Sequence, residues 1–296
     1  EAVRCRPSSL AHAGELREDR EIVLAAVDTS GFALQFASPR LRADPEVVRR
    51  SVARDADSLA FADPKLQGDK SLVLEAVRAC PSTLEFASPE LRRDKDVVLE
   101  AVTRCGFALK HAAPERCDDE DVILAAIRHS ASTLRRASSR LRSSAAFVLE
   151  ALALNPGVLF HADDVLRNSK DFALKAVQRR GDSLRCLHEK FRNDKEVVML
   201  AVRESGHTLA FASEGLKDDR EVVLAAIGVC GSALVHGSHR LRAERAVVLA
   251  AVSQEGSALA YGSEDFRHDR EFIMLAVALN GLCLQHLERM KSLSKA

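Results

Sequence analysis

Large aromatic and sulfur-containing side chains are scarce in this sequence of 296 residues, which contains no Trp, one Tyr and three Met. Pro, the strongest helix breaker, occurs only eight times. Hydrophobic residues nevertheless make up 47% of the chain, and most of them are Ala, Leu and Val. This amino-acid composition favours helices that pack closely through small side chains.

The sequence has no excess of charge of either sign, because 43 Lys and Arg residues are balanced by 43 Asp and Glu residues. A neutral chain has no overall field to attract nucleic acid or an anionic membrane surface. It also lacks any apolar run close to the roughly 18 residues of a membrane-spanning helix. Nucleic acid is therefore disfavoured as a partner, and no membrane span is expected.

Seven cysteines are present, and none of them has the C-x-x-C spacing typical of zinc and redox sites. Three of them, Cys80, Cys105 and Cys230, fall at equivalent places in the repeat described below. This pattern favours small buried thiols in a reducing, intracellular compartment over disulfides or a metal site.

An internal repeat of 25 residues runs through the chain without insertion or deletion. Its first position is most often Asp and falls at residues 19, 44, 69, 94, 119, 144, 169, 194, 219, 244 and 269. Position 16 is Leu in every repeat, from Leu34 to Leu284. Eleven repeats follow one another in this frame.

Each repeat predicts two helices and one further helical turn. Asp at position 1 is a good N-cap, and the apolar positions that follow cover a broad helix face that is flanked by several neighbours. Gly at position 13, as in Gly31, predicts a helix end with positive φ, and Ser or Asp at position 14 predicts the cap of the second helix. Ser-Pro pairs such as Ser38-Pro39 predict the start of the extra turn.

A helix pair of 25 residues cannot bury its own apolar faces, so the repeats must stack. The predicted fold is an all-α solenoid of about eleven helix-pair repeats, in a single domain over residues 1–296. Residues 1–18 match a partial repeat, which indicates a longer array, 19–268 hold ten full repeats, and 269–296 hold the terminal repeat and tail. The last part predicts contact with another subunit through Leu275, Leu279, Leu282, Leu287 and Met290.

The repeat resembles that of the family catalogued as domain of unknown function 4116. The resemblance rests on strings such as DKDVVLEAVTRCGFAL at residues 94–109 and DKEVVMLAVRESGHTLAFAS at residues 194–213, and it covers nearly the whole chain. It weakens at Arg116-Cys117, where Leu-Arg is expected, and in the two repeats that begin with Ser. The family implies tandem helical repeats and brings no assigned activity. A more distant similarity to the leucine-rich variant repeat implies the same stacked-helix architecture.

Motifs for catalysis and cofactor binding are missing from the sequence. Gly occurs singly at the turn position, and no G-x-S-x-G, H-E-x-x-H or Walker pattern is present. Position 18 holds Phe or Tyr in many repeats and His in four, which predicts packing rather than metal ligation for His111, His161, His236 and His286. We therefore expect a non-enzymatic protein without cofactor or metal.

Basic residues recur at position 24, two residues before the acidic cap of the next repeat. We interpret them as a ladder of salt bridges between repeats, with ligand binding as the alternative. Surface pairs of this kind contribute about 0–1 kcal/mol each, so the Leu and Val columns must hold the stack. The position-24 residues are Arg42, Arg92, Arg142, Arg167, Arg192, Lys217, Arg242 and Arg267.

Repeats in the middle of the chain break the pattern at positions that should be exposed. The repeat at residues 144–168 places Leu154, Phe160 and Val165 at positions 11, 17 and 22, where many other repeats have polar or charged residues. The two neighbouring repeats are basic and contribute Arg128, His129, Arg135 and Arg136 on one side and Arg179, Arg180 and Arg185 on the other.

Equivalent positions of stacked repeats align in rows. We expect one row of His129, Leu154 and Arg179 and another of Arg135, Phe160 and Arg185. Our hypothesis is that this apolar patch with a basic rim docks an acidic, partly hydrophobic segment of a protein partner, with Leu154 and Phe160 as anchors. The alternative is a degenerate repeat whose extra apolar residues are covered by a local distortion.

Two further functions fit the sequence less closely. A structural accessory subunit or spacer would engage a large assembly through its ends rather than its face. An RNA-binding helical repeat would read bases through exposed columns, but position 10 lacks the amide and hydroxyl pairs that such a code needs.

Overall fold

A computed structural model describes residues 7–12 and 14–283, apart from the side chains of Pro7 and Arg267. These residues form helices and short connections, and no β-strand occurs among them. The chain divides into two compact units, residues 1–142 and residues 143–296, and each is described by itself. In neither unit is a described helix long and apolar enough to cross a membrane.

Most repeats of the first unit contain a long α-helix (α), a 3₁₀ helix (η) and a further short helix, in that order. In chain order the helices are η1 (Pro7–His12), η2 (Gly14–Glu18), α2 (Arg20–Val27), η3 (Gly31–Phe36), α3 (Pro39–Arg42), α4 (Pro45–Arg54), η4 (Ala56–Phe61), α5 (Pro64–Gln67), α6 (Lys70–Ala79), η5 (Pro81–Phe86), α7 (Pro89–Arg93), α8 (Lys95–Arg104), η6 (Gly106–His111), η7 (Pro114–Asp118), α9 (Glu120–Ile127), η8 (Ala131–Arg136) and α10 (Ser139–Ser143).

The repeats of the second unit have the same order of helices. Its helices are α11 (Ala145–Leu154), η9 (Pro156–His161), α12 (Asp164–Arg167), α13 (Lys170–Arg179), η10 (Gly181–Cys186), η11 (Glu189–Asn193), α14 (Lys195–Glu204), η12 (Gly206–Phe211), α15 (Glu214–Lys217), α16 (Arg220–Val229), η13 (Gly231–His236), α17 (His239–Arg242), α18 (Arg245–Gln254), η14 (Gly256–Tyr261), α19 (Asp265–His268) and α20 (Arg270–Leu279).

Each repeat therefore consists of a long α-helix, a 3₁₀ helix and a short helical turn, which confirms the predicted helical repeat and its extra turn. The second helix of the predicted pair is a 3₁₀ helix of six residues, such as η4 or η12. Residues before Asp19 supply two 3₁₀ helices, η1 and the shorter η2. Leu10 of η1 is fully buried.

The predicted caps of the long helices are present. Asp44 accepts hydrogen bonds from the backbone N–H groups of Glu46 and Val47, and the carboxylates of Asp94 and Asp194 do the same in their repeats. Ser169, which replaces Asp in its repeat, still accepts one hydrogen bond, from Phe172 N–H. These bonds satisfy donors that a helix N-terminus leaves without partners.

The core of both units is formed by the invariant Leu at position 16 and the apolar positions of the long helices. Leu34, Leu84 and Leu134 in the first unit and Leu184 and Leu234 in the second are inaccessible to solvent. Leu284, the last member of this column, lies outside the described residues. The column holds each 3₁₀ helix against the long helix of its own repeat, as α4 packs on η4 and α18 on η14.

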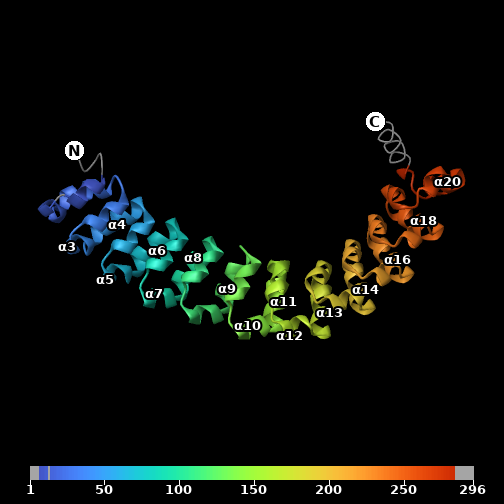
Figure 1. The fold of residues 1–296 in the computed structure, drawn as a ribbon, viewed down its shortest axis with the longest axis horizontal. Coiled ribbons are helices and arrows are strands. Elements are labelled where there is room, and N and C mark those ends of the chain that lie inside the picture. Colours follow the sequence, from blue (N-terminus) through green and yellow to red (C-terminus); the bar gives the residue numbers. More distant parts are fainter. Residues whose placement is uncertain (1–6, 13, 284–296) are drawn as a thin grey trace. The chain divides into compact units, whose positions relative to one another are not determined.

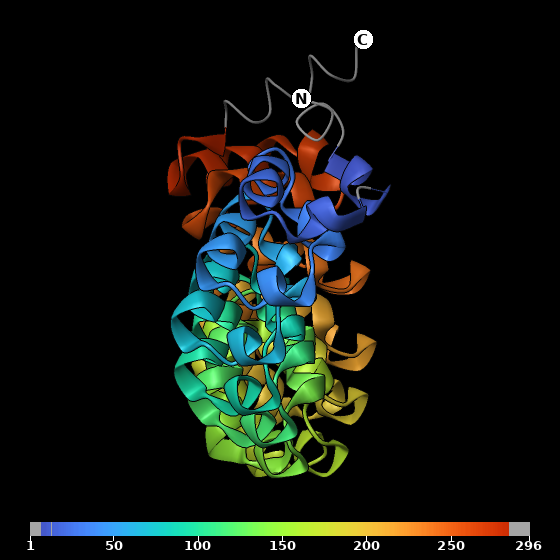
Figure 2. The same cartoon turned by 90° about the vertical axis from the view of Figure 1, so that its left-hand side faces the viewer.

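Contacts between repeats run in sequence order within each unit. In the first unit α2, α4, α6, α8 and α9 pack successively, and the 3₁₀ helices between them form a second row. Figure 1 shows α4, α6 and α8 following one another, with α3, α5 and α7 along a different edge. Seen from the side in Figure 2, the first unit's repeats succeed one another from blue to green. In the second unit α13, α14, α16, α18 and α20 pack in the same way.

The glycines that recur at position 13 do not adopt positive φ, so the prediction of positive φ is wrong. Among the described residues only Gly14 has a positive φ, of 53°. At the position-13 glycines from Gly31 to Gly256 the next repeat approaches closely, whereas four repeats have Ala or Pro at this position. A β-carbon at Gly31 would lie 2.5 Å from the carbonyl oxygen of Ser51, and one at Gly106 would lie 2.6 Å from that of Ala126. Both carbonyls belong to position 8 of the following repeat.

The predicted cap of the second helix is also displaced. Position 14 lies inside the 3₁₀ helix, and the extended residue before the helix is at position 12, as in Ser130 and Asn155. Their side chains accept hydrogen bonds from Ser132 N–H and Gly157 N–H, respectively. In most repeats this extended residue is all that separates the long α-helix from the 3₁₀ helix, whereas Arg128 and His129 form a turn before Ser130.

A ladder of salt bridges joins the repeats, but position 24 does not form it. Its cations stand at position 2, and they contact the acids at positions 1 and 3 of the next repeat. Lys195, for example, lies 2.7 Å from Asp219 and 2.8 Å from Glu221. The cations of these salt bridges are Arg20, Lys70, Lys95, Lys170, Lys195, Arg220 and Arg245.

The arginines at position 24 are half-buried instead, and the buried Nε atoms of Arg42, Arg92 and Arg242 have no hydrogen-bond partner within the described part of the chain. Their backbone carbonyls receive N–H donors from the next repeat, as Asp63 donates to Arg42 over 2.9 Å. Position 24 therefore serves packing and backbone contact between repeats, and Arg267 lies outside the described side chains.

Candidate partner-binding surfaces

A shallow pocket of about 380 Å³ lies on the first unit between η6 and η8. It is lined by Phe107 from η6 and by Arg135 and Arg136 from η8, together with Ser132 and Thr133. The Phe107 ring is 60% exposed, although it is one of the largest apolar side chains of the unit. We call Phe107, Arg135 and Arg136 the first-unit surface.

The two arginines of the first-unit surface are exposed, and neither forms an ion pair with a described carboxylate. The positive charge of Arg136 acts on the nearby His111. The pKa of His111 is lowered, first by burial of its ring and then by the charges of Lys110 and Arg136. The surface therefore combines an apolar ring with positive charge that the chain itself does not neutralise.

Arg128 and His129, the other candidates in the first unit, lie at the end of α9 and are both exposed. The His129 ring contacts the previous repeat, with Nε2 2.9 Å from the carbonyl oxygen of Thr103. Its ring is thus held in place by α8, whereas Arg128 has no described ion-pair partner.

On the second unit, Leu154 ends α11 and is 40% exposed. Arg179 ends the neighbouring helix α13 at the same repeat position and is exposed. Because α11 packs against α13, the two side chains are neighbours in one row. Arg179 also reaches back to α11, where its Nη1 donates to the carbonyl oxygen of Leu149 over 3.2 Å.

A second row lies on the 3₁₀ helices of this unit. Phe160 of η9 is 52% exposed, and Arg185 occupies the equivalent position of η10, which packs against η9. Arg185 is exposed and has no described carboxylate partner. We call Leu154, Phe160, Arg179 and Arg185 the second-unit surface.

Two residues predicted from the sequence, Arg180 and Val165, do not belong to the second-unit surface. Arg180 is half-buried and its guanidinium lies 3.0 Å from the carboxylate of Asp182, which neutralises it. Val165 is 81% exposed and lies on the short helix α12, which follows η9. The equivalent residue of the next repeat is Lys190, whose Nζ donates a hydrogen bond to the carbonyl oxygen of Asn168.

Phe107 was not among the residues predicted from the sequence. The signal that could have identified it is its column, because position 14 holds Ser, Asp or His in most repeats and an aromatic residue only at Phe32 and Phe107. Phe32 packs edge-on against Phe61 of the next repeat, with ring centroids 6.3 Å apart. In the repeat that follows Phe107, the residue equivalent to Phe61 is Arg136.

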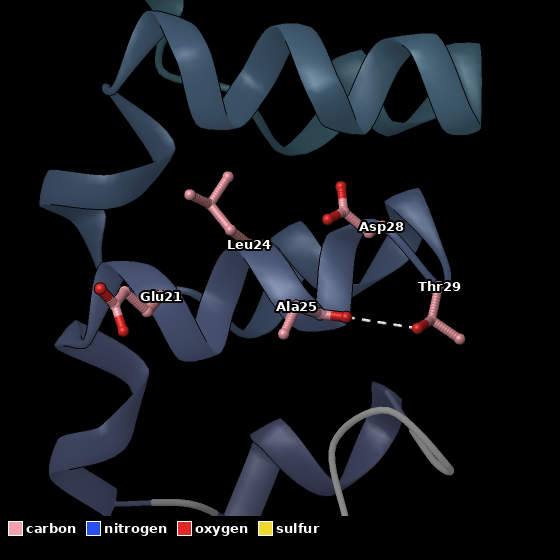
Figure 3. Close-up of a pocket in the computed structure, with 5 residues that line it drawn as sticks. All are labelled: Glu21, Leu24, Ala25, Asp28 and Thr29. Carbon is pink, nitrogen blue, oxygen red and sulfur yellow. Dashed lines mark hydrogen bonds between the residues drawn. The ribbon is translucent and has the colours of Figure 1, made fainter. Parts of the chain in front are cut away.

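Another depression, of about 400 Å³, lies on α2 and is lined by Glu21, Leu24, Ala25, Asp28 and Thr29 (Figure 3). Its polar groups are largely engaged: Thr29 donates to the carbonyl oxygen of Ala25, and Asp28 pairs with Arg50. It has no convergent set of free polar groups, and it includes none of the predicted residues.

Within the described ranges, no group of three or more His, Cys, Asp or Glu side chains is arranged to hold a metal ion. The described cysteines are free thiols, of which Cys186 and Cys283 are buried and Cys80, Cys105, Cys117 and Cys230 are half-buried. Burial raises the pKa of the thiols of Cys117, Cys186 and Cys283.

Regular helical repeats that pack only on their sequence neighbours define each unit as an α-solenoid. A profile of the family described as domain of unknown function (DUF4116) matches the chain at residues 1–42, 19–67, 44–92, 69–116, 94–142, 119–167, 146–192, 194–242 and 244–291, and each match spans close to two repeats. The chain belongs to this family. No curated protein and no solved structure matches it.

Proposed function

We propose that this chain is a non-enzymatic scaffold that binds acidic, partly hydrophobic segments of protein partners. The observation that carries the proposal is the pairing of exposed apolar side chains with arginines that have no carboxylate partner among the described residues. Phe107 lies beside Arg135 and Arg136, and Phe160 lies in a row with Arg185. Seven other cations, at position 2 of their repeats, are instead paired with carboxylates in the ladder between repeats.

Each surface has the composition of a small binding hot spot. An exposed Phe or Leu gains roughly 1.5–3 kcal/mol when a partner buries it fully. Arginines at the rim attract a negatively charged segment and orient it, and they are enriched at the energetic centres of interfaces. A segment that carries carboxylates around one or two large apolar residues would complement both features.

The test uses fluorescent peptides of about 15 residues that contain Glu and Asp around two Leu or Phe residues, a length that suits an extended segment across neighbouring repeats. Control peptides replace each acid by Lys. We expect the acidic peptides to bind the purified chain, more weakly as salt rises, and the basic peptides not to bind.

The double variant Leu154→Glu/Phe160→Glu removes both apolar anchors of the second-unit surface, and Phe107→Glu removes that of the first. We expect each variant to weaken peptide binding about tenfold or more, as loss of a hot-spot residue does. The matched control is Arg203→Glu, which changes an exposed residue of α14 outside both surfaces. If all variants fold and bind the peptides equally well, the proposal is wrong.

A single-stranded RNA oligomer serves as the competing ligand in the same assay. Arginines also bind phosphates, and binding through phosphate contacts falls steeply as salt concentration rises. RNA binding that exceeds acidic-peptide binding and survives Phe160→Glu would favour the RNA-binding alternative over the scaffold.

The accessory-subunit alternative is supported by the exposed apolar face of the last described helix. Met274, Leu275 and Leu279 of α20 and the following Leu282 are all exposed, whereas Leu287 and Met290 lie outside the described residues. Leu275→Glu/Leu279→Glu should then disrupt an assembly of the native protein seen by size-exclusion chromatography. Leu154→Glu/Phe160→Glu should leave that assembly intact.

A further inference from the structure

Reactive and titratable side chains from three consecutive repeats meet on the second unit. Sγ of Cys230 lies 3.4 Å from Nε2 of His207 and 3.0 Å from Oγ of Ser232. The carboxylate of Glu255 lies 4.0 Å from the same sulfur. The His207 ring contacts the His236 ring edge-on, with centroids 6.0 Å apart, so His207 is held in position on both sides.

We propose that Cys230 is a modification site, at which His207 activates the thiol toward hydroperoxides. Nε2 of His207 accepts the thiol proton while Sγ attacks the terminal oxygen of the peroxide. An S–O bond forms and the O–O bond breaks. The proton passes to the departing oxygen, which leaves as water or an alcohol. The sulfur is oxidised to a sulfenic acid and the peroxide is reduced.

Glu255 supports the proton transfer through its negative charge. Its carboxylate accepts hydrogen bonds from the hydroxyl of Ser257 and from the backbone N–H of Ser232, the latter over 3.0 Å. These bonds lower the pKa of Glu255, the Ser257 bond most, and the charge of His207 lowers it further. The carboxylate is therefore ionised near neutral pH, where it stabilises the imidazolium that forms as sulfur reacts.

Cys80 and Cys105 provide comparators within the same chain, because both stand at position 12 like Cys230 and are half-buried like it. The residue that corresponds to His207 is Asp57 in the case of Cys80 and Ser82 in the case of Cys105. Neither can accept a proton as an imidazole does at neutral pH. Only Cys230, among the described cysteines, has a histidine nitrogen within hydrogen-bond distance.

The experiment measures the rate of sulfenic acid formation at each cysteine, with hydrogen peroxide as oxidant, dimedone as trap and mass spectrometry as readout. We expect Cys230 to react about tenfold faster or more than Cys80 and Cys105, in line with general-base assistance. In His207→Gln, the rate at Cys230 should fall to that of Cys105. Because His207 is exposed, this variant should keep the thermal unfolding temperature of the parent chain.

A gain-of-function variant makes the test independent of the second unit. Ser82→His places an imidazole next to Cys105 in the position that His207 takes beside Cys230, and it should raise the rate at Cys105 severalfold. Equal rates at the three cysteines of the parent chain, an unchanged rate at Cys230 in His207→Gln, or an unchanged rate at Cys105 in Ser82→His would each overturn the proposal.

Discussion

Gly206 lies so close to the carbonyl oxygen of Ala226 that a β-carbon on it would stand only 2.5 Å from that oxygen. Ala226 belongs to the long helix of the next repeat, where it is fully buried. The same relation joins Gly181 to Ala201 and Gly231 to Ala251, at 2.6 Å each. The glycine column therefore sets how closely successive repeats approach one another.

Substitution of one of these glycines should separate two repeats. We expect Gly231→Ala to destabilise the chain by about 1–3 kcal/mol, because the new methyl group forces the backbone of the next repeat to shift. The matched control is Gly228→Ala, whose β-carbon would meet nothing within 4 Å. Gly228 lies inside α16, where Ala is favoured over Gly by about 0.5–1 kcal/mol, so this variant should be stabilised. Urea unfolding measures both, and a stabilised Gly231→Ala would contradict the close approach.

The invariant Leu column should dominate stability. Leu209 is fully buried, so Leu209→Ala should cost about 2–5 kcal/mol through lost burial and the cavity that remains. Leu154→Ala, at a partly exposed position of the same unit, should change stability by about 0.5 kcal/mol or less. Unfolding in urea compares the two. Equal losses would show that Leu154 is part of the core rather than of a binding surface.

Acid should weaken the ladder between repeats. The hydrogen bond from Lys195 lowers the pKa of Asp219 below its ordinary value of 3.8, and backbone N–H groups lower it further. A carboxyl whose pKa is lower in the folded state stabilises the fold above its unfolded pKa and loses this effect as the pH falls through the folded value. Stability should therefore decline as the pH drops below about 4.

Asp219→Asn isolates this charge, because Asn also caps helices well. We expect the urea midpoint of the variant to fall less between pH 7 and pH 3 than that of the parent chain. The pKa of Lys195 is raised by the same pair, so its contribution is retained at neutral pH and lost only as the pH rises through its folded value. An identical acid response of variant and parent would exclude Asp219 as a contributor.

A salt bridge can be added between two repeats that lack one in the ladder. The repeat that begins at Ser144 has Ala145 at position 2, and the next repeat begins with Ser169. In Ala145→Lys/Ser169→Asp, the new pair should raise the urea midpoint by more than the two single variants combined, and salt should remove this excess. Simple additivity at low salt would show that these two repeats are spaced differently from the others.

Much of this architecture was predictable because its causes are local in sequence. The period of 25 residues, the Asp caps and the buried Leu column follow from capping and helical periodicity, which act within one repeat. The exposure of Leu154 and Phe160 also followed, since their columns hold polar or small residues in most other repeats. Neutralisation of Arg180 by Asp182 did not follow, because it depends on side-chain geometry within one turn.

The sequence by itself determined that this chain is a helical repeat protein, with its frame, its caps and its core columns. Only the tertiary structure decided that the glycines serve close approach rather than positive φ, that position 2 rather than position 24 carries the ladder, and that His207 meets Cys230. The physical reason is distance: these contacts join residues about one repeat apart in sequence, and the packing of neighbouring repeats sets which side chains come within reach.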